Sequence, residues 1–153
     1  MERLKHWLPL LLWASLITSF STDTFSKEHT SRVILPVLHW LLPYASDATL
    51  DVLHTVVRKC AHVFEYFVFG VLLFRAIRAP ARGWNVRWAG IAVLVAAVFA
   101  ASDEFHQSFV PSRGASVWDA SLDTAAAAAA QLILWLWWRR RLSANSDGPP
   151  RTS

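Results

Sequence analysis

The sequence predicts an all-α membrane protein: a polytopic helical bundle of about four transmembrane helices, with an interfacial or re-entrant segment between the first two. Apolar residues make up 54% of the 153 residues and charged residues only 17%, a balance shifted from soluble domains towards lipid. Several apolar runs approach the length of a membrane span, and basic residues gather between them. The length allows a single domain, which we place at residues 1–142.

The first apolar run extends from Trp7 to Phe20 and follows a basic start. By itself this pattern resembles a signal peptide. We favour a retained helix over residues 4–20, because the charges later in the chain fit an even number of spans best. The run is short, so the bilayer would have to thin around it.

Residues 33–42 are apolar but contain Pro36 and His39. This segment is too short and too interrupted to cross a bilayer, which favours an interfacial or re-entrant position. Ser46 then provides N-cap chemistry for a helix that is expected to continue into the second span, residues 60–77.

The third and fourth spans are predicted at residues 88–102 and 120–138. The connection from Arg78 to Arg87 before the third span is rich in arginine and carries no acid, as expected of a cytoplasmic loop. Residues 143–153 are polar and rich in Gly and Pro at their end, which predicts a disordered cytoplasmic tail.

The basic residues are distributed unevenly over this topology. With both termini in the cytoplasm, ten of the fifteen Lys and Arg residues lie inside, which supports four spans. These ten are Arg3, Lys5, Arg75, Arg78, Arg82, Arg87, Arg139, Arg140, Arg141 and Arg151. Such short clusters do not form the aromatic-interleaved basic face of a nucleic-acid interface, so membrane lipid is the expected partner and nucleic acid is not.

Ten polar residues lie inside or at the edge of the predicted spans, where ionisable groups are costly unless paired or hydrated. In the four-span topology all ten fall on the outer side of the membrane. The first four recur at three- and four-residue spacing, which places them on one face of a helix. The ten are Lys59, His62, Glu65, Tyr66, Asp103, Glu104, Gln107, Arg113, Asp119 and Asp123.

A His with several carboxylates can perform acid and base catalysis, because burial moves the pKa of either type towards neutrality. We therefore expect catalytic roles for His62, Glu65, Asp103 and Glu104. Lys59 and Arg113 can hold an anionic group. The other four residues, Tyr66, Gln107, Asp119 and Asp123, are expected to bind substrate. Divalent metal binding through the carboxylates, or through His plus carboxylate, stays open.

The structural alternative is that these side chains pair across helices and fix their packing, with no substrate at all. An N-cap role would explain Asp119 equally well. An ion or proton conductor is disfavoured, because the cytoplasmic halves of the spans lack a polar relay. The remaining histidines are expected to be interfacial or solvated; these are His6, His29, His39, His54 and His106.

Three blocks of the chain resemble the VanZ-like family of small bacterial membrane proteins. They read RKCAHVFEYF at 58–67, SDEFHQSFVPSRG at 102–114 and DASLDT at 119–124, and the resemblance covers roughly residues 30–138. The family pattern carries over to all ten polar residues. The sequence departs from it after Thr124, where an alanine run replaces the usual Gly, and a slightly wider helix contact is expected there.

The resemblance implies an integral protein of the bacterial cytoplasmic membrane, within a family whose named member is associated with low-level resistance to the glycopeptide teicoplanin. It does not imply a reaction, because the family has no settled one. We expect a site at the outer face that binds, and acts on, an envelope or lipid-linked substrate. The alternative is a non-catalytic membrane protein whose polar cluster is structural or contacts an envelope partner.

Overall fold

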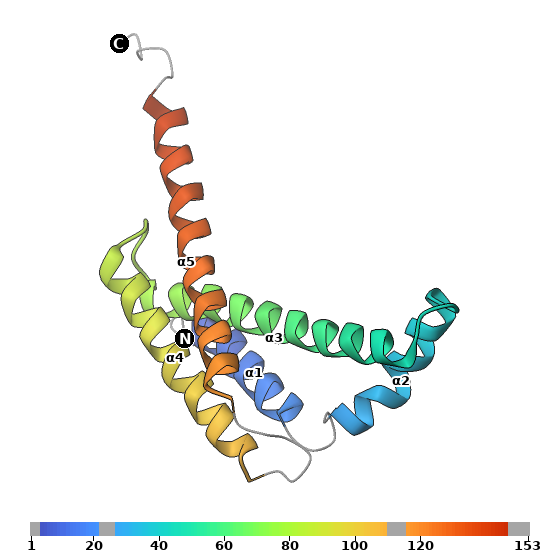
Figure 1. Ribbon diagram of the computed structural model, residues 1–153. Helices are drawn as coiled ribbons and strands as arrows, with labels where there is room; N and C mark the ends of the chain where they lie inside the picture. The colour runs from blue at the N-terminus through green and yellow to red at the C-terminus, as the bar shows by residue number, and fades with distance from the viewer. Residues whose placement is uncertain (1–3, 22–26, 110–115, 147–153) are drawn as a thin grey trace, which may run out of the picture.

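The computed structural model describes residues 4–21, 27–109 and 116–146, and Figure 1 shows the helices that these ranges form. No strand occurs in the described ranges, so the all-α prediction is confirmed. In chain order the helices are α1 (Leu4–Phe20), α2 (Lys27–Leu41), α3 (Asp47–Arg78), α4 (Val86–Gln107) and α5 (Val117–Ser146).

Three of these helices, α3, α4 and α5, are long and apolar enough to cross a membrane. The fold is therefore a helical membrane bundle, as predicted. Helix α1 has 17 residues and so measures about 26 Å at 1.5 Å per residue. This is slightly less than the hydrocarbon thickness of about 30 Å, and a fourth span formed by α1 stays a prediction.

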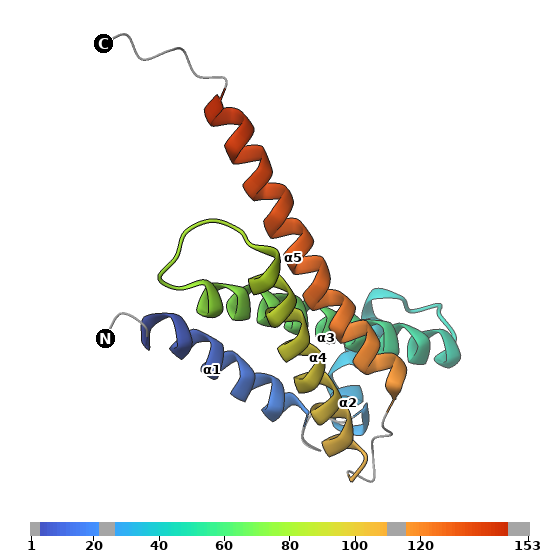
Figure 2. The ribbon, with the colours of Figure 1, turned by 90° about the vertical axis from the view of Figure 1, so that its left-hand side faces the viewer.

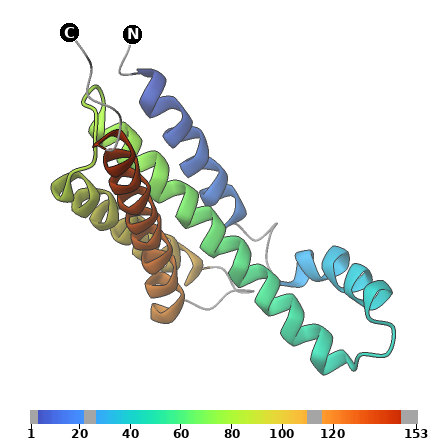
Figure 3. The same cartoon turned by 90° about the horizontal axis from the view of Figure 1, so that it is seen from above.

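Helix α3 combines the predicted amphipathic segment with the second span in 32 unbroken residues. It begins where the N-cap signal indicates: Ser46 has an extended backbone, and its hydroxyl accepts a hydrogen bond from the amide of Thr49 at 3.3 Å. The first part of α3 packs against α2, which folds back along it (Figure 3). Helix α2 continues through Pro36 and begins within the polar segment before the predicted apolar stretch.

The prediction of a disordered tail from residue 143 is wrong for its first four residues. Helix α5 continues to Ser146, because the apolar and arginine-rich sequence before it favours helix and no Gly or Pro interrupts it until Gly148. Residues 147–153 lie outside the described ranges. Helices α4 and α5 both extend beyond the predicted spans at residues 88–102 and 120–138.

Helix α3 is the centre of the arrangement, because it contacts each of the other four helices. Helix α1 runs antiparallel beside it (Figure 3), and α5 crosses it while also packing on α4 (Figures 1 and 2). The start of α1, the connection from α3 to α4 and the end of α5 lie towards one end of the bundle (Figure 3). We call this the arginine end, since Arg75, Arg78, Arg82 and Arg87 lie in or next to that connection.

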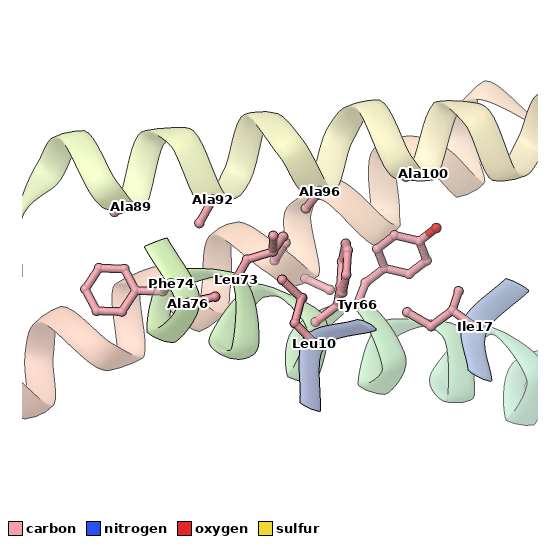
Figure 4. Packing of buried hydrophobic residues seen from close by; sticks show 13 residues of the cluster. Leu10, Ile17, Tyr66, Leu73, Phe74, Ala76, Ala89, Ala92, Ala96 and Ala100 are labelled. Carbon is pink, nitrogen blue, oxygen red and sulfur yellow. The ribbon is translucent and has the colours of Figure 1, made fainter. Parts of the chain in front are cut away.

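The core depends on small side chains of α4. Ala89, Ala92, Ala96 and Ala100 recur every three or four residues and are all buried, which forms one smooth stripe along the helix. Figure 4 shows these alanines facing Tyr66 and Leu73 of α3, with Leu10 and Ile17 of α1 on the other side. Close helix contact through small residues is how membrane helices gain packing without a hydrophobic driving force.

The crossing of α3 and α5 is closer still. A Cβ atom added to Gly70 would lie 3.0 Å from both the Cα and the carbonyl oxygen of Ala127. Gln131, buried one turn later, donates a 2.9 Å hydrogen bond to the Gly70 carbonyl. A slightly wider helix contact was expected at the alanine run. The contact is close instead, because the glycine that permits it, Gly70, belongs to α3 and not to α5.

Replacement of Gly70 by Ala should therefore destabilise the bundle. Overpacking of a fitted contact costs about 1–3 kcal/mol, which exceeds the gain of about 1 kcal/mol in helix propensity. Gly90→Ala is the matched control, since a Cβ there meets nothing within 4 Å, and it should be neutral or stabilising. Unfolding in detergent titrations measures both variants, and equal stability for the two would contradict the account of this crossing.

Candidate functional site

The RKCAHVFEYF block lies in the middle of α3, and its polar residues share one face as the spacing predicts. Glu65 and Tyr66 are buried, His62 is half-buried and Lys59 is exposed. His62 Nδ1 lies 3.7 Å from Glu65 Oε2, which makes an ion pair whenever the imidazole is protonated. Helix α1 fixes the backbone here, because Trp13 Nε1 donates a 3.0 Å hydrogen bond to the Glu65 carbonyl.

The last two turns of α4 provide three further predicted residues. Asp103, Glu104 and Gln107 are all buried, so α4 extends as far as the one-turn spacing of these residues requires. Gln107 Nε2 donates to Asp103 Oδ2 at 2.9 Å and to the hydroxyl of Ser21 at 3.0 Å. The amide of Gln107 thereby holds one carboxylate and connects α4 to the end of α1.

Glu104 connects α4 to the start of α5. Its Oε2 atom accepts a 2.7 Å hydrogen bond from the backbone amide of Ser116. Ser116 in turn caps α5, because its hydroxyl accepts from the amide of Asp119 at 3.3 Å. Ser116 therefore has the N-cap role that was considered for Asp119.

Helix α5 carries the two remaining predicted carboxylates. Asp119 forms an ion pair with Lys59, which joins α5 to α3 across 60 residues of sequence. Both side chains of this pair are partly exposed. Asp123 lies one turn deeper and is buried, with 3% of its surface exposed.

The three helices bring their acidic side chains together around Tyr66. Its side chain is fully buried, and its hydroxyl has no hydrogen-bond partner within the described residues. Four carboxylates are close enough to interact with it electrostatically, and we call them the acidic cluster: Asp103, Asp123, Glu65 and Glu104. Asp123 also interacts electrostatically with the other three. Residues of all three blocks thus lie near one another in the fold, whereas their position on the outer side stays a prediction.

Two pairs between a basic and an acidic side chain occur beside this cluster in the part of the chain that the structure describes. His62 faces Glu65, and Lys59 is directed to Asp119 at the periphery. Within the described ranges, neither Asp103 nor Asp123 forms an ion pair with a Lys, Arg or His side chain. The cluster therefore combines four carboxylates in a buried environment, where each is costly when ionised.

A pocket of about 180 Å³ lies beside the cluster, between the end of α1, α2 and α3. Apolar side chains of Phe20, Ile34 and Val57 line much of it. Its polar wall is formed by Thr30, Arg58, His62 and Glu65. The pocket therefore connects an apolar space between helices with the acid and base candidates of α3.

Several polar contacts near this pocket are not evident from the sequence. His54 was expected to be interfacial or solvated, and this is wrong. It is fully buried, with Nε2 3.2 Å from the Thr30 hydroxyl, which also accepts from Arg58 Nη1 at 3.0 Å. The partners come from α2 and α3, so only the tertiary fold brings them together. Ser21 and Gln131 are also buried and hydrogen-bonded, and no motif indicates them.

Arg113 lies outside the described residues, so its predicted role stays a prediction. In the described part of the chain, no group of three or more His, Cys, Asp or Glu side chains is placed to hold a metal ion.

Replacement of Gln107 by Glu should destabilise the bundle. It removes both donated hydrogen bonds and places a fifth carboxylate beside Asp103, which costs about 1–3 kcal/mol. Asp103→Asn in the same chain should recover part of the loss by restoring a donor. A double-mutant cycle of unfolding free energies measures this coupling, and strictly additive effects would contradict the contact.

Comparison with known proteins gives one result. The profile of the family described as VanZ/LLP1 matches residues 6–138, which includes all five helices in whole or in part and every predicted site residue. The match begins earlier than the predicted resemblance at residue 30, so it includes α1. No curated protein and no solved structure matches the chain.

Proposed function

This chain belongs to the VanZ/LLP1 family, and on that premise we propose that its acidic cluster binds, and acts on, a lipid-linked substrate of the bacterial envelope. The observation that carries the proposal is the burial of four carboxylates from three helices around the Tyr66 hydroxyl, which has no hydrogen-bond partner among the described residues. Each charge within a spanning helix costs about 2.5–3.5 kcal/mol on insertion scales. A ligand that donates hydrogen bonds or positive charge would offset that cost.

The proposal includes an orientation in the bacterial cytoplasmic membrane. Arginines gather at one end of α3, α4 and α5, and the positive-inside rule makes that end cytoplasmic. Both termini are then cytoplasmic as well. Asp103 lies 17 residues along α4 from Val86, or about 26 Å, so the acidic cluster would face the outer leaflet. Lipid-linked envelope precursors are accessible to it there.

The pocket between α1, α2 and α3 would receive the apolar tail of such a substrate. Its apolar lining suits hydrocarbon, and His62 and Glu65 in its polar wall would lie next to the bound head group. His62 and Glu65 would move a proton to or from that group, as general acid and base. Asp103 and Glu104 would also act as general acid or base. Tyr66, Gln107 and Asp123 would bind the substrate.

Lys59 and Asp119 form the edge of the proposed site. Lys59 would release Asp119 and bind an anionic group of the substrate, such as a phosphate, in its place. Arg113 would assist from the segment between α4 and α5. A link to teicoplanin resistance would then be an effect of altered envelope chemistry.

The competing function is a purely structural cluster that holds the helices together or contacts an envelope partner. The ligand-site proposal and the structural alternative predict different effects of neutral substitutions. Glu65→Gln, Asp103→Asn and His62→Gln keep hydrogen-bonding capacity but remove or alter the titrating group. A ligand site would lose its ligand while the protein stays folded, whereas a structural network would lose stability along with it.

We expect native mass spectrometry of detergent-purified protein to detect a copurified lipid-linked molecule. Glu65→Gln or Asp103→Asn should lower its occupancy about tenfold, the equivalent of one lost charge-assisted hydrogen bond. Asp51→Asn is the control, because Asp51 is an exposed carboxylate on α3 outside the pocket and the cluster. Unchanged occupancy in the cluster variants, or a loss that only follows unfolding, would refute the ligand site.

A further inference from the structure

A second cavity lies at the arginine end, far from the acidic cluster. It has a volume of about 220 Å³ and lies between the end of α3, the α3–α4 connection and α5. Its lining has two kinds of side chain. Val71, Phe74 and Leu134 supply an apolar surface, whereas Arg75 and Arg78 supply guanidinium groups.

The polar atoms of this cavity are hydrogen-bond donors. Arg78 donates one hydrogen bond from Nη1 to the Gly83 carbonyl at 3.2 Å, but a guanidinium carries five N–H donors. Trp84 also lines the cavity, and its indole Nε1 is buried with no hydrogen-bond partner within the described residues. A buried donor without an acceptor costs about 1–3 kcal/mol. A ligand rich in acceptor oxygens would satisfy it.

The segments that line this cavity carry charge of one sign. The chain carries no Asp or Glu from Tyr66 to Ser102, or from Thr124 to Ser146, and these two ranges contain all the lining residues. Arg139 and Arg141 extend the positive charge along α5, where they stack over Trp135 and Trp137 at 4.9 and 3.9 Å. The cavity therefore favours an anion.

The position of the cavity indicates that the anion is the head group of a lipid. Trp84, Trp135 and Trp137 gather at the ends of membrane-spanning helices, and tryptophan is enriched at the level of the lipid head groups. The apolar side chains of the cavity come from the parts of α3 and α5 that lie further into the membrane than these tryptophans. A ligand that fills both parts has an anionic head and a hydrocarbon chain.

We propose that this cavity binds an anionic glycerophospholipid, with its phosphate held by Arg75, Arg78 and the Trp84 indole N–H. An acyl chain lies along Val71, Phe74 and Leu134. The site is independent of the acidic cluster, and it holds a resident lipid at the opposite end of the bundle.

The experiment is a lipid titration of the full chain followed by native mass spectrometry. The probes are phosphatidylglycerol, phosphatidylcholine with the same acyl chains, and inorganic phosphate. Arg75→Gln removes one charged donor, and Trp84→Phe removes the indole N–H but keeps an aromatic ring. Arg87→Gln is the control, because it removes one exposed charge from the same end without lining the cavity.

We expect phosphatidylglycerol to bind more tightly than phosphatidylcholine. Arg75→Gln should raise its Kd about tenfold, and Trp84→Phe should raise it several-fold, since each removes a donor to phosphate. Arg87→Gln should change the Kd less than twofold. Thermal unfolding without added lipid checks that each variant is folded.

Three results would overturn the proposal. An equal effect of Arg87→Gln and Arg75→Gln would show general electrostatic attraction without a defined site. Competition by inorganic phosphate as effective as by the lipid would show a free-anion site. Equal affinity for both phospholipids in all variants would show that the cavity does not select an anionic lipid.

Discussion

The close crossing of α3 and α5 is the constraint on which the rest of the structure depends. Gly70 lacks a side chain where Ala127 approaches to 3.0 Å of the missing Cβ, and Gln131 secures the crossing with a hydrogen bond. This contact brings the first turns of α5 against the middle of α3, while the alanine stripe of α4 closes the other side. Tyr66 on α3 and Asp123 on α5 each lie one turn from the crossing, so their burial follows from it.

Such burial creates an electrostatic conflict that the described contacts only partly relieve. Gln107 supports Asp103, the amide of Ser116 supports Glu104, and His62 faces Glu65. The Lys59–Asp119 pair lies at the periphery, and partly exposed pairs of this kind contribute little to stability. A bundle under selection for stability alone would gain from replacing one or more of these acids by neutral residues. Their presence beside an apolar pocket, which Glu65 itself lines, supports the proposed ligand site.

Local spacing explains what could be predicted from the sequence. His62, Glu65 and Tyr66 share a face because a helix repeats every 3.6 residues, and Ser46 caps α3 because its hydroxyl fits the first turn. The burial of His54 could not be predicted, since its partner Thr30 lies on another helix 24 residues away. Ser21 and Gln131 were missed for the same reason. The Gly70 contact has no signature on α3, because a single Gly in an apolar run does not reveal which helix crosses it.

The central claim is that the acidic cluster exists to bind a ligand and not to hold the helices together. The free energy of unfolding of Asp123→Asn, measured without added lipid and compared with Asp51→Asn, tests it most directly. Our account predicts that Asp123→Asn is at least as stable as the unsubstituted protein, because it removes one of four carboxylates that repel one another when ionised in a buried site. A loss of about 1–3 kcal/mol, typical of breaking a buried polar network and absent in Asp51→Asn, would contradict it.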